Sequence, residues 1–245
     1  MARFDKKESA EAPLTTLTLF GYDSNFGRLW AFSQMGLAGL DLKKIPGLQF
    51  WKLLGSGEGG GFSIKPNWSR YGLLCVWETR ADADAFFTGS ELMRKFRRRA
   101  AEIWTVYLLP VRSHGNWAGA NPFEPSVLAK SDSAVAVLTR ATIRLPKLYR
   151  FWSFVPRTSR EIERAEGLIA SIGVGEAPLL RQATFSLWQS EKAMRDFSYK
   201  NAVHAQVIKL TRAENWYAEE LFARFTPIAS EGIWNGRDPL KNINL

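Results

Sequence analysis

One of the two histidines in this chain, His204, lies in a stretch with helical periodicity, Ser190–Leu210. Phe197, Asn201, His204 and Ile208 are spaced at i, i+4, i+7 and i+11, so they share one face of the expected helix. Phe197 and Ile208 predict that this face is buried, and an unpaired buried polar group costs about 1–3 kcal/mol. His204 is therefore either a core histidine that hydrogen-bonds a carbonyl or a buried water, or a metal ligand, with haem iron as the leading case.

Few other residues could bind a metal. The chain contains one cysteine and two histidines, which excludes an internal disulfide, a Cys-based zinc site, an iron–sulfur cluster held by one chain and a His-rich metal centre. Cys75 lies between Leu74 and Val76 in a predicted strand, so we expect it in the core rather than on a haem. His114, the other imidazole, lies in a glycine-rich segment predicted to be a flexible linker, which would hold an axial ligand poorly.

The glycine-rich segment Gly55–Gly60, GSGEGG, matches the G-x-G-x-x-G pattern of dinucleotide-binding sites. Such a site also needs a helix that begins at the last glycine, whereas Pro66 and the residues before it argue against a helix. The segment is therefore predicted to be a structural turn. The chain also has no H-E-x-x-H, Walker or G-x-S-x-G motif.

The segments that would position these residues follow a recognisable order. The first part of the chain predicts a strand, helix, strand, strand, helix and strand, which are Leu14–Phe20, Arg28–Leu40, Leu48–Leu54, Tyr71–Trp77, Arg80–Arg98 and Ala101–Val111. This β-α-β-β-α-β order is the ferredoxin-like arrangement. A stretch rich in Gly, Pro, Asn and Ser then predicts a linker over residues 112–132.

The same order is predicted again after the linker. Its elements are Ala134–Ile143, Lys147–Arg164 with a break at Pro156, Gly167–Val174, Gln182–Trp188, Ser190–Leu210 and Tyr217–Pro227. Trp77 and Trp188 end the third strand of each part, and Gly55–Gly57 is matched with Gly173–Gly175. The sequence therefore predicts an α+β fold of two tandem ferredoxin-like halves, residues 14–111 and 133–228, that pack sheet against sheet.

The charge balance is basic, with 33 Lys and Arg against 24 Asp and Glu and a net charge of +9. Such a balance suits nucleic acid, an anionic membrane surface or an acidic partner. The densest cluster, Arg94–Arg99 (RKFRRR), is interpreted as a solvated helix face, and no zinc finger, RNP motif or basic–aromatic repeat supports nucleic-acid binding. The chain lacks a spanning apolar run and an N-terminal secretory signal, so we expect a cytoplasmic protein that can meet a membrane peripherally.

Long blocks of the sequence also indicate a family. They are RLWAFSQMGLA, FWKLLGSG with GFSIKPNW, WTVYLLPV, NPFEP, AVLTRATIR, GVGEAPLLRQATFSLW, WYAEELFARF and GIWNGRDPL. From about Leu17 to Leu240 these blocks resemble the spheroidene monooxygenase family. The resemblance implies a dimeric α+β barrel fold, which two tandem halves of a single chain or a homo-oligomer could form. It also implies a haem-dependent oxygenase that introduces a keto group into an acyclic carotenoid. It further implies dioxygen as the oxidant and a ferredoxin-type electron donor.

The resemblance also implies a position for the cofactor. Haem proteins built on tandem ferredoxin-like halves hold the iron through a histidine on a helix of the second half, which in this chain is His204, with Phe197 and Ile208 beside it. Because the chain has no C-x-x-C-H motif, the group would be haem b, held without thioether bonds. Iron and dioxygen would carry the chemistry, while the protein would orient the substrate.

Other side chains are candidates for the rest of the site. Arg140 shares a strand face with Ala136 and Leu138. Its guanidinium either points into an apolar pocket, where it could pair with a haem propionate or polarise dioxygen, or reaches solvent from the strand end. A second set shares one face of its own strand and could line the space between the halves: Thr184, Ser186 and Trp188.

Three functional classes remain open from the sequence. The first is a haem monooxygenase that acts on a long apolar polyene. The second is a haem enzyme of another reaction type, peroxidase-like or dehydratase-like, and the third is a cofactor-free barrel protein that only binds a hydrophobic ligand. An absorption spectrum of the purified protein separates the third class from the other two.

Overall fold

The strands of this protein close into a single barrel. The computed structural model describes residues 13–59, 63–126, 133–177, 179–200, 202–243 and 245, without the side chains of residues 156–158, 160, 199, 200, 202–205 and 208. Within the described residues the strands are β1 Leu14–Gly21, β2 Leu48–Gly57, β3 Pro66–Trp77, β4 Glu102–Gly115, β5 Val135–Ile143, β6 Leu168–Ala177, β7 Arg181–Trp188 and β8 Tyr217–Gly232. The helices are α2 Asn25–Leu42, α3 Arg80–Gly89, α4 Glu91–Arg97, α5 Leu148–Glu163, α6 Glu191–Lys200 and α7 Ala202–Ala213, with a short 3-10 helix, η1 Leu145–Lys147, before α5.

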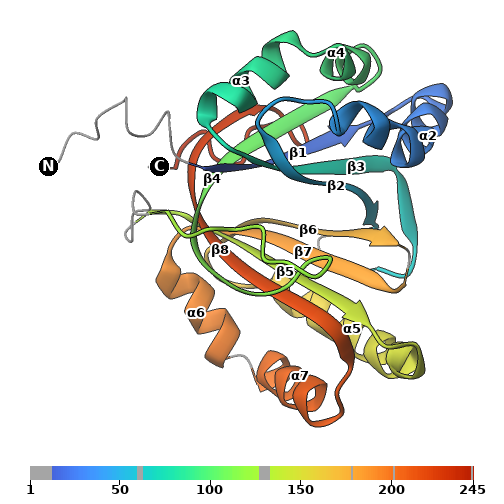
Figure 1. Cartoon of the computed structure of the whole chain (residues 1–245). Helices are drawn as coiled ribbons and strands as arrows, with labels where there is room; N and C mark the ends of the chain where they lie inside the picture. The colour runs from blue at the N-terminus through green and yellow to red at the C-terminus, as the bar shows by residue number, and fades with distance from the viewer. Residues whose placement is uncertain (1–12, 60–62, 127–132, 178, 201, 244) are drawn as a thin grey trace, which may run out of the picture.

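The strand order around the barrel is β1-β3-β2-β6-β7-β5-β8-β4, and each neighbouring pair is antiparallel. Figure 1 shows helices α2, α3 and α4 on one side of the barrel and helices α5, α6 and α7 on the other. The expected α+β barrel is thereby confirmed. Closure gives every strand of the barrel a neighbour on both sides, which is the physical advantage of a barrel over two open sheets, although β2 and β6 pair only at Gly55–Gly175 and Ser56–Val174.

The barrel interior is a continuous apolar core. Alternate side chains of each strand point inward, as those of Leu17 and Leu19 do on β1. Trp104, Phe185 and Phe225 are among the largest side chains that fill the space, and each is at most 1% exposed. The interior is therefore a packed core to which all eight strands contribute.

The order of elements from β1 to β4 recurs from β5 to β8. Helices α3 and α6 each begin three residues after a tryptophan, Trp77 or Trp188, and each is ten residues long. Those tryptophans end β3 and β7, as predicted, and pair with Leu48 of β2 and Leu168 of β6. Leu48 and Leu168 therefore occupy equivalent positions in the two parts of the chain.

Gly55 is paired with Tyr71, six residues before Trp77, and Gly175 with Gln182, six residues before Trp188, so Gly55 corresponds to Gly175. The predicted match of Gly55 with Gly173 is therefore wrong by two residues. A side chain at Gly175 would put its Cβ 2.5 Å from the carbonyl oxygen of Arg181, so the strand needs glycine there. Gly55, Ser56 and Gly57 are strand residues of β2, so the turn predicted over residues 55–60 is wrong for its first three residues.

The helix predicted over residues 80–98 is two helices, α3 and α4. Ser90 separates them because its backbone is extended (φ −73°, ψ 139°) and its hydroxyl accepts a hydrogen bond from the N–H of Met93, which caps α4. A glycine and a serine at this point favour a cap over a continued helix. The single helix predicted here is therefore wrong.

The helix predicted over residues 190–210 corresponds to α6 and α7, and residue 201 between them lies outside the described residues. Phe197 lies on α6, whereas His204 and Ile208 lie on α7; Asn201 falls outside the described residues, as do the side chains of His204 and Ile208. Whether they share one face of a continuous helix depends on residue 201, so that part of the prediction stays a prediction. In contrast, α5 runs through position 156 without the predicted break.

Strand β4 is longer than predicted. It extends to Gly115 and pairs with β8 as far as Leu221, so residues 112–115 belong to the strand and not to the expected linker. His114 is consequently held in a sheet, opposite Phe222. The prediction that His114 lies on a flexible loop is wrong, because the pairing with β8 could not be inferred from the local glycine content.

Two similar turns close the barrel. Gly115–Pro122 and Gly232–Pro239 share the pattern Gly-x-Trp-x-Gly-x-Asn/Asp-Pro. In each turn the two residues after the tryptophan have positive φ, 59° and 84° in the first and 55° and 76° in the second. Because β4 and β8 are antiparallel neighbours, the turns that follow them lie at opposite ends of the barrel. Their tryptophans, Trp117 and Trp234, pack into the interior core.

Candidate active site

A row of side chains crosses the outer face of the sheet beneath helices α5, α6 and α7. Thr139 of β5 is paired with Thr184 of β7 on one side and with Phe222 of β8 on the other, and Phe222 is paired with His114 of β4. Residues directly opposite each other on neighbouring strands point to the same face. Phe222 packs with Val137 in a cluster that also contains helix residues, so the row faces the helices.

The centre of this outer face is open. Thr139 is exposed and its neighbours Thr184 and Phe222 are only half-buried. Leu14 of β1 is paired with Trp77, and Val135 of β5 is paired with Trp188. Thr18 and Thr139 each lie four residues later, so Thr18 is the corresponding position on the other side of the barrel. Thr18 is fully buried, and its hydroxyl hydrogen-bonds that of Thr105 at 3.0 Å. The sheet beneath α2, α3 and α4 is therefore sealed at a point where the sheet beneath α5, α6 and α7 is not.

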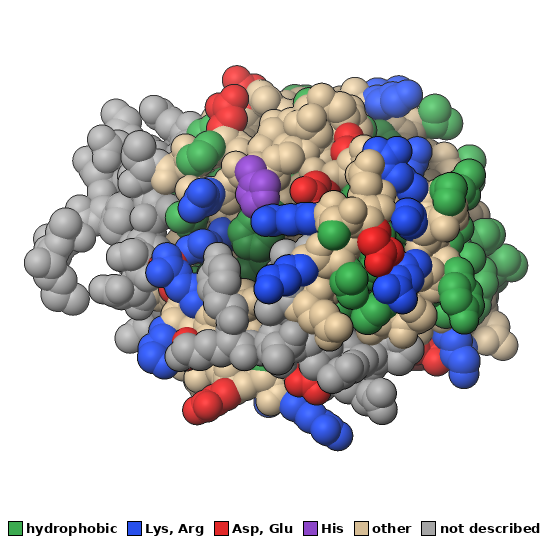
Figure 2. Space-filling model, turned by 90° about the horizontal axis from the view of Figure 1, so that it is seen from below, with side chains coloured by type: hydrophobic (Ala, Val, Ile, Leu, Met, Phe, Trp, Pro, Cys, Tyr) green, Lys and Arg blue, Asp and Glu red, His purple; other side chains and the backbone are tan. Residues whose placement is uncertain are grey.

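The apolar layer under the helices differs in the same way. Beneath α2, α3 and α4 the described side chains form one cluster. Beneath α5, α6 and α7 they form two, one around Trp188 and Met194 and the other around Phe151, Trp152 and Trp216. Figure 2 shows this side of the molecule, with a hollow that has a hydrophobic floor and has basic side chains and a histidine at its edge. The two clusters thus stand on either side of an uncovered strip of sheet.

Charged side chains border the open strip near the start of α6. Arg224 of β8 contacts Glu191 in the first turn of α6, and Arg195 lies 2.7 Å from the same carboxylate. Arg112 is paired with Arg224 on the neighbouring strand. The Nε of Arg224 is buried and has no hydrogen-bond partner among the described residues. This rim has more positive than negative charge and could bind a carboxylate.

Aromatic rings supply flat surfaces around the strip. Phe197 of α6 lies on Trp188 of β7, with 5.3 Å between the ring centroids and 33° between the planes. The His114 ring lies against that of Phe222 at 5.4 Å and 30°. Offset and tilted pairs of this kind are favourable beyond their buried area. The walls are therefore suited to a large, flat, apolar group.

The predicted site residues do not all meet at this strip. Phe197 lies at its edge, and α7, which carries positions 204 and 208, packs against α5 through Val207 and Leu210 in the cluster around Trp216. The roles predicted for His204 and Ile208 remain predictions, because their side chains are outside the described set. Within the described side chains, no group of three or more His, Cys, Asp or Glu could hold a metal ion.

Arg140 lies on the opposite face of the sheet, inside the barrel. It is 3% exposed, so the alternative of an arginine that reaches solvent is wrong. Its guanidinium contacts Glu219, lies 3.4 Å from Glu176, and stands over the ring of Trp117 at 5.6 Å. Lys52 is 3.1 Å from Glu176. The sheet separates this ion cluster from Thr139, and the charge of Arg140 is already balanced there.

The strand that ends at Trp188 is oriented differently from the expectation. Trp188 packs beneath α6, and its Nε1 donates to the hydroxyl of Ser186 at 2.9 Å. The neighbouring side chains of Phe185 and Leu187 point into the barrel. The expectation that Thr184, Ser186 and Trp188 line the space between the halves is therefore wrong, because the alternation of the strand turns them toward the helices.

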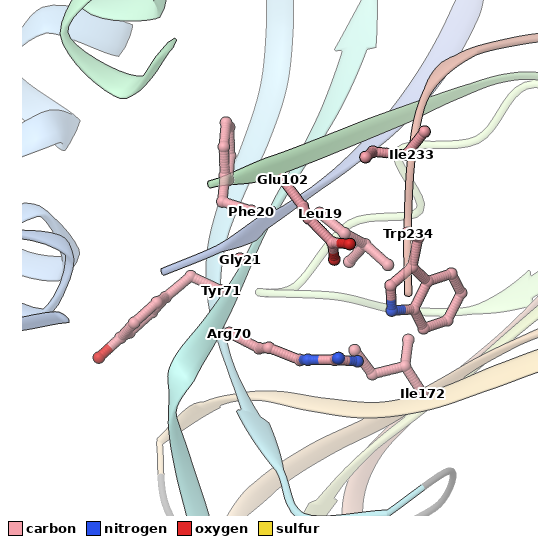
Figure 3. Close-up of a pocket in the computed structure, with 9 residues that line it drawn as sticks. All are labelled: Leu19, Phe20, Gly21, Arg70, Tyr71, Glu102, Ile172, Ile233 and Trp234. Atoms are coloured by element: carbon pink, nitrogen blue, oxygen red, sulfur yellow. The ribbon is translucent and has the colours of Figure 1, made fainter. Parts of the chain in front are cut away.

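A separate small pocket lies at the end of the barrel that Trp234 closes (Figure 3). The side chains of Arg70 and Glu102 point toward it, whereas the hydroxyl of Tyr71 points away. Arg70 donates to Asn235, and Glu102 accepts from the N–H groups of Asn235 and Gly236. Arg70 and Glu102 thus hold the turn in place, whereas the Nε1 of Trp234 is buried without a hydrogen-bond partner among the described residues.

Sequence reasoning missed the strip itself. Thr139 looks like an ordinary strand residue, and only the comparison with Thr18 shows that its face is uncovered. No local signal marked His114 as a strand residue, because Val111 is followed by three polar residues and then by Gly115. Among the described residues no helix is long and apolar enough to cross a membrane.

The chain has clear relatives among characterised proteins, although no protein-family model matches it. The spheroidene monooxygenase of Rhodobacter capsulatus is 39% identical over 230 residues, which cover 93% of this chain and 95% of that protein. The spheroidene monooxygenase of Cereibacter sphaeroides is 39% identical over 226 residues, which cover 92% and 70%. That of Rubrivivax gelatinosus is 39% identical over 210 residues, which cover 86% and 80%.

Solved structures support the fold. An aldoxime dehydratase in complex with butyraldoxime superposes with a TM-score of 0.59 at 11% identity, over 98% of this chain and 86% of that one. A second aldoxime dehydratase structure gives a TM-score of 0.52 at 12% identity, over 92% and 84%. At such identities the likeness is one of fold alone. The sequence relatives are far more similar and match along nearly the whole chain, and on that basis this chain belongs to the spheroidene monooxygenase family.

Proposed function

We propose that this protein is a haem-dependent monooxygenase that introduces a keto group into an acyclic carotenoid or a similar long apolar molecule. Membership of the family supports the reaction class and the substrate class. The single observation that supports the cofactor is the uncovered strip of sheet at Thr139, bordered by two apolar clusters, at a position that is sealed on the other side of the barrel. A flat apolar macrocycle is the kind of group that would cover it.

The residues around the strip suit haem b in both shape and charge. His204 on α7 would be the axial ligand, with Ile208 on the same helix and Phe197 on α6 beside the ring. Arg224 and Arg112 lie on the rim, where guanidinium groups would pair with carboxylates of the bound group. When bound, the haem iron supplies the site at which dioxygen is activated.

The chain's own residues would then orient the substrate. The hydroxyls of Thr139 and Thr184 are the polar groups in the centre of the strip, and Phe222 supplies an apolar surface next to them. Conversion of a methylene to a ketone consumes two dioxygen molecules, four electrons and four protons, and releases three water molecules. We therefore propose that a ferredoxin-type donor delivers the electrons and that the singly hydroxylated product binds a second time.

We also propose that the chain consists of two ferredoxin-like halves, residues 14–111 and 133–228. The recurring order of elements, the matched positions of Leu48 and Leu168, and the paired turns around Trp117 and Trp234 support this reading. Within it the second half is the haem-binding half, and Thr18 marks the equivalent, sealed position in the first.

The test compares the two histidines. Purified protein reconstituted with haem should give a Soret band. His204→Ala should abolish or shift this band. His114→Ala should retain the band, because His114 lies on the sheet at the edge of the strip. Circular dichroism should show that both variants stay folded. The axial assignment fails if His204→Ala keeps the wild-type spectrum and His114→Ala loses it.

A second measurement tests the reaction. The reconstituted protein, given an acyclic carotenoid, dioxygen and reduced ferredoxin, should form a product in which one oxygen replaces two hydrogens. Bound haem without this product would favour a haem enzyme of another reaction type. Failure to bind haem at all would favour a barrel that only binds a hydrophobic ligand.

A further inference from the structure

Helix α2 has an unusual distribution of side chains. Three of its four buried residues are small, Gly27, Ala31 and Ala38, and the fourth is Leu42 near its end. A Cβ at Gly39 would lie 2.8 Å from the ring of Trp51, so the helix packs closely on the sheet there. Large apolar residues are left on the outside, contrary to the usual arrangement in which they face the core.

The outer surface of α2 is mostly apolar, with Ser33 as an exposed polar residue within it. Its apolar face consists of side chains that are 51–72% exposed and are spaced at i, i+3, i+6, i+11 and i+14: Phe26, Leu29, Phe32, Leu37 and Leu40. Trp68 of β3 extends this face, because it is 54% exposed and its ring lies 5.3 Å from that of Phe32. Between Arg28 and Asp41 the helix carries no charge.

A basic cluster adjoins the apolar face. Helix α4 and the residues after it contain the Arg94–Arg99 cluster, in which Arg94 and Arg98 are mostly exposed. Lys95 lies 3.7 Å from Asp41 near the end of α2, and Arg99 stands over the ring of Trp30 at 4.5 Å. Figure 1 shows α2 and α4 on the same side of the barrel. A large apolar surface and a dense positive charge thus lie side by side.

We infer that this combined surface, the apolar face of α2 with Trp68 and the basic cluster of α4, docks onto an anionic lipid bilayer. Large apolar side chains enter the boundary between headgroups and acyl chains, with Trp68 suited to that interface. The arginines contact the headgroup phosphates. The charge selects a lipid surface over a second copy of this chain, since two copies of the same basic cluster would repel each other. The inference does not depend on the proposed chemistry, because binding is measured without substrate.

The test is cosedimentation of the full chain with vesicles of phosphatidylcholine and phosphatidylglycerol in equal parts, and with vesicles of phosphatidylcholine alone. The wild-type protein should bind the mixed vesicles more tightly. Leu29→Ser with Leu40→Ser should weaken binding by roughly tenfold or more, whereas Leu29→Met with Leu40→Met should retain it. Arg97→Gln with Arg98→Gln should cost about fivefold for each residue, and the corresponding lysine substitutions should cost little.

These positions are exposed, so the variants should stay folded, which circular dichroism verifies. The inference is overturned if the serine variant binds like the wild type, or if binding is equal to neutral and anionic vesicles. It is also overturned if the serine substitutions instead convert a dimer into a monomer in sedimentation, because α2 would then be an interface between copies of the chain.

Discussion

The ion cluster around Arg140 offers a sharp test of what this residue does. Arg140→Met removes a buried cation that contacts Glu219 and Glu176 and leaves both carboxylates in place. Removal of one partner from a buried ion pair typically costs about 3–5 kcal/mol. The side chains of Glu176 and Glu219 are 14% and 24% exposed, and Lys52 remains 3.1 Å from Glu176. We therefore expect a smaller loss in the free energy of unfolding, about 2–3 kcal/mol at neutral pH.

The loss should depend on pH in a defined direction. Burial opposes ionisation of Glu219, but hydrogen bonds from the N–H of Gly119 and from Arg140 outweigh it, so the pKa of Glu219 lies below its ordinary value. Its stabilising contribution is complete above the unfolded pKa of a glutamate, about 4.3, and disappears as the pH falls through the lower folded pKa. The difference between wild type and Arg140→Met should accordingly shrink below about pH 4.5.

Guanidinium unfolding followed by circular dichroism measures the effect. Arg150→Met is the matched control, because Arg150 and Glu214 form a partly exposed pair 3.1 Å apart, which should contribute at most about 1 kcal/mol. The haem spectrum of Arg140→Met should be unchanged, since the sheet lies between Arg140 and the strip. A loss below about 1 kcal/mol, or one that does not vary with pH, would refute the reasoning. An altered haem spectrum with unchanged stability would instead place Arg140 in the site.

Two further predictions concern the strip and the core. Thr139→Trp should fill the open centre of the sheet and lower haem affinity by at least about tenfold, while Thr139→Val should not; haem titration measures this, and equal affinity in the two variants would contradict the location of the site. Burial raises the pKa of the Cys75 thiol well above its ordinary value, so a thiol reagent at mildly alkaline pH should react only after unfolding. Rapid reaction in the native protein would show that β3 is not sealed beneath α3.

Local pattern predicted the strands well because their signal is contained in a few neighbouring residues. Leu14–Phe20 became β1, and Trp77 and Trp188 ended β3 and β7 as expected. The boundaries of the helices were less certain for the same reason. A cap at Ser90 competes with helix continuation over a single residue, and periodicity over a longer window does not detect it.

The candidate site could be predicted only in part. The position of His204 on a helix of the second part of the chain follows from the sequence. Its relation to Phe197 stays a prediction, because residue 201 between α6 and α7 and the side chain of His204 lie outside the described residues. The strand face of Arg140 predicts a place near the site, yet this face points into the barrel. Its partners there, Glu176 and Glu219, are 36 and 79 residues away in the chain, so the local sequence does not reveal them.

The sequence by itself determined where strands and helices lie and in which order, though not every boundary, and it determined the family, because these depend on local hydrophobic pattern and on blocks of matching residues. Only the tertiary structure decided which faces are covered. Thr18 and Thr139 occupy matching positions on similar strands, yet one is buried and the other exposed, because the helices above them pack differently. Leu29 belongs to an apolar helix, but the small residues of that helix pack against the sheet more closely than a leucine could, so Leu29 is left on the outside. Burial is a property of two surfaces in contact, and the second surface comes from distant parts of the chain.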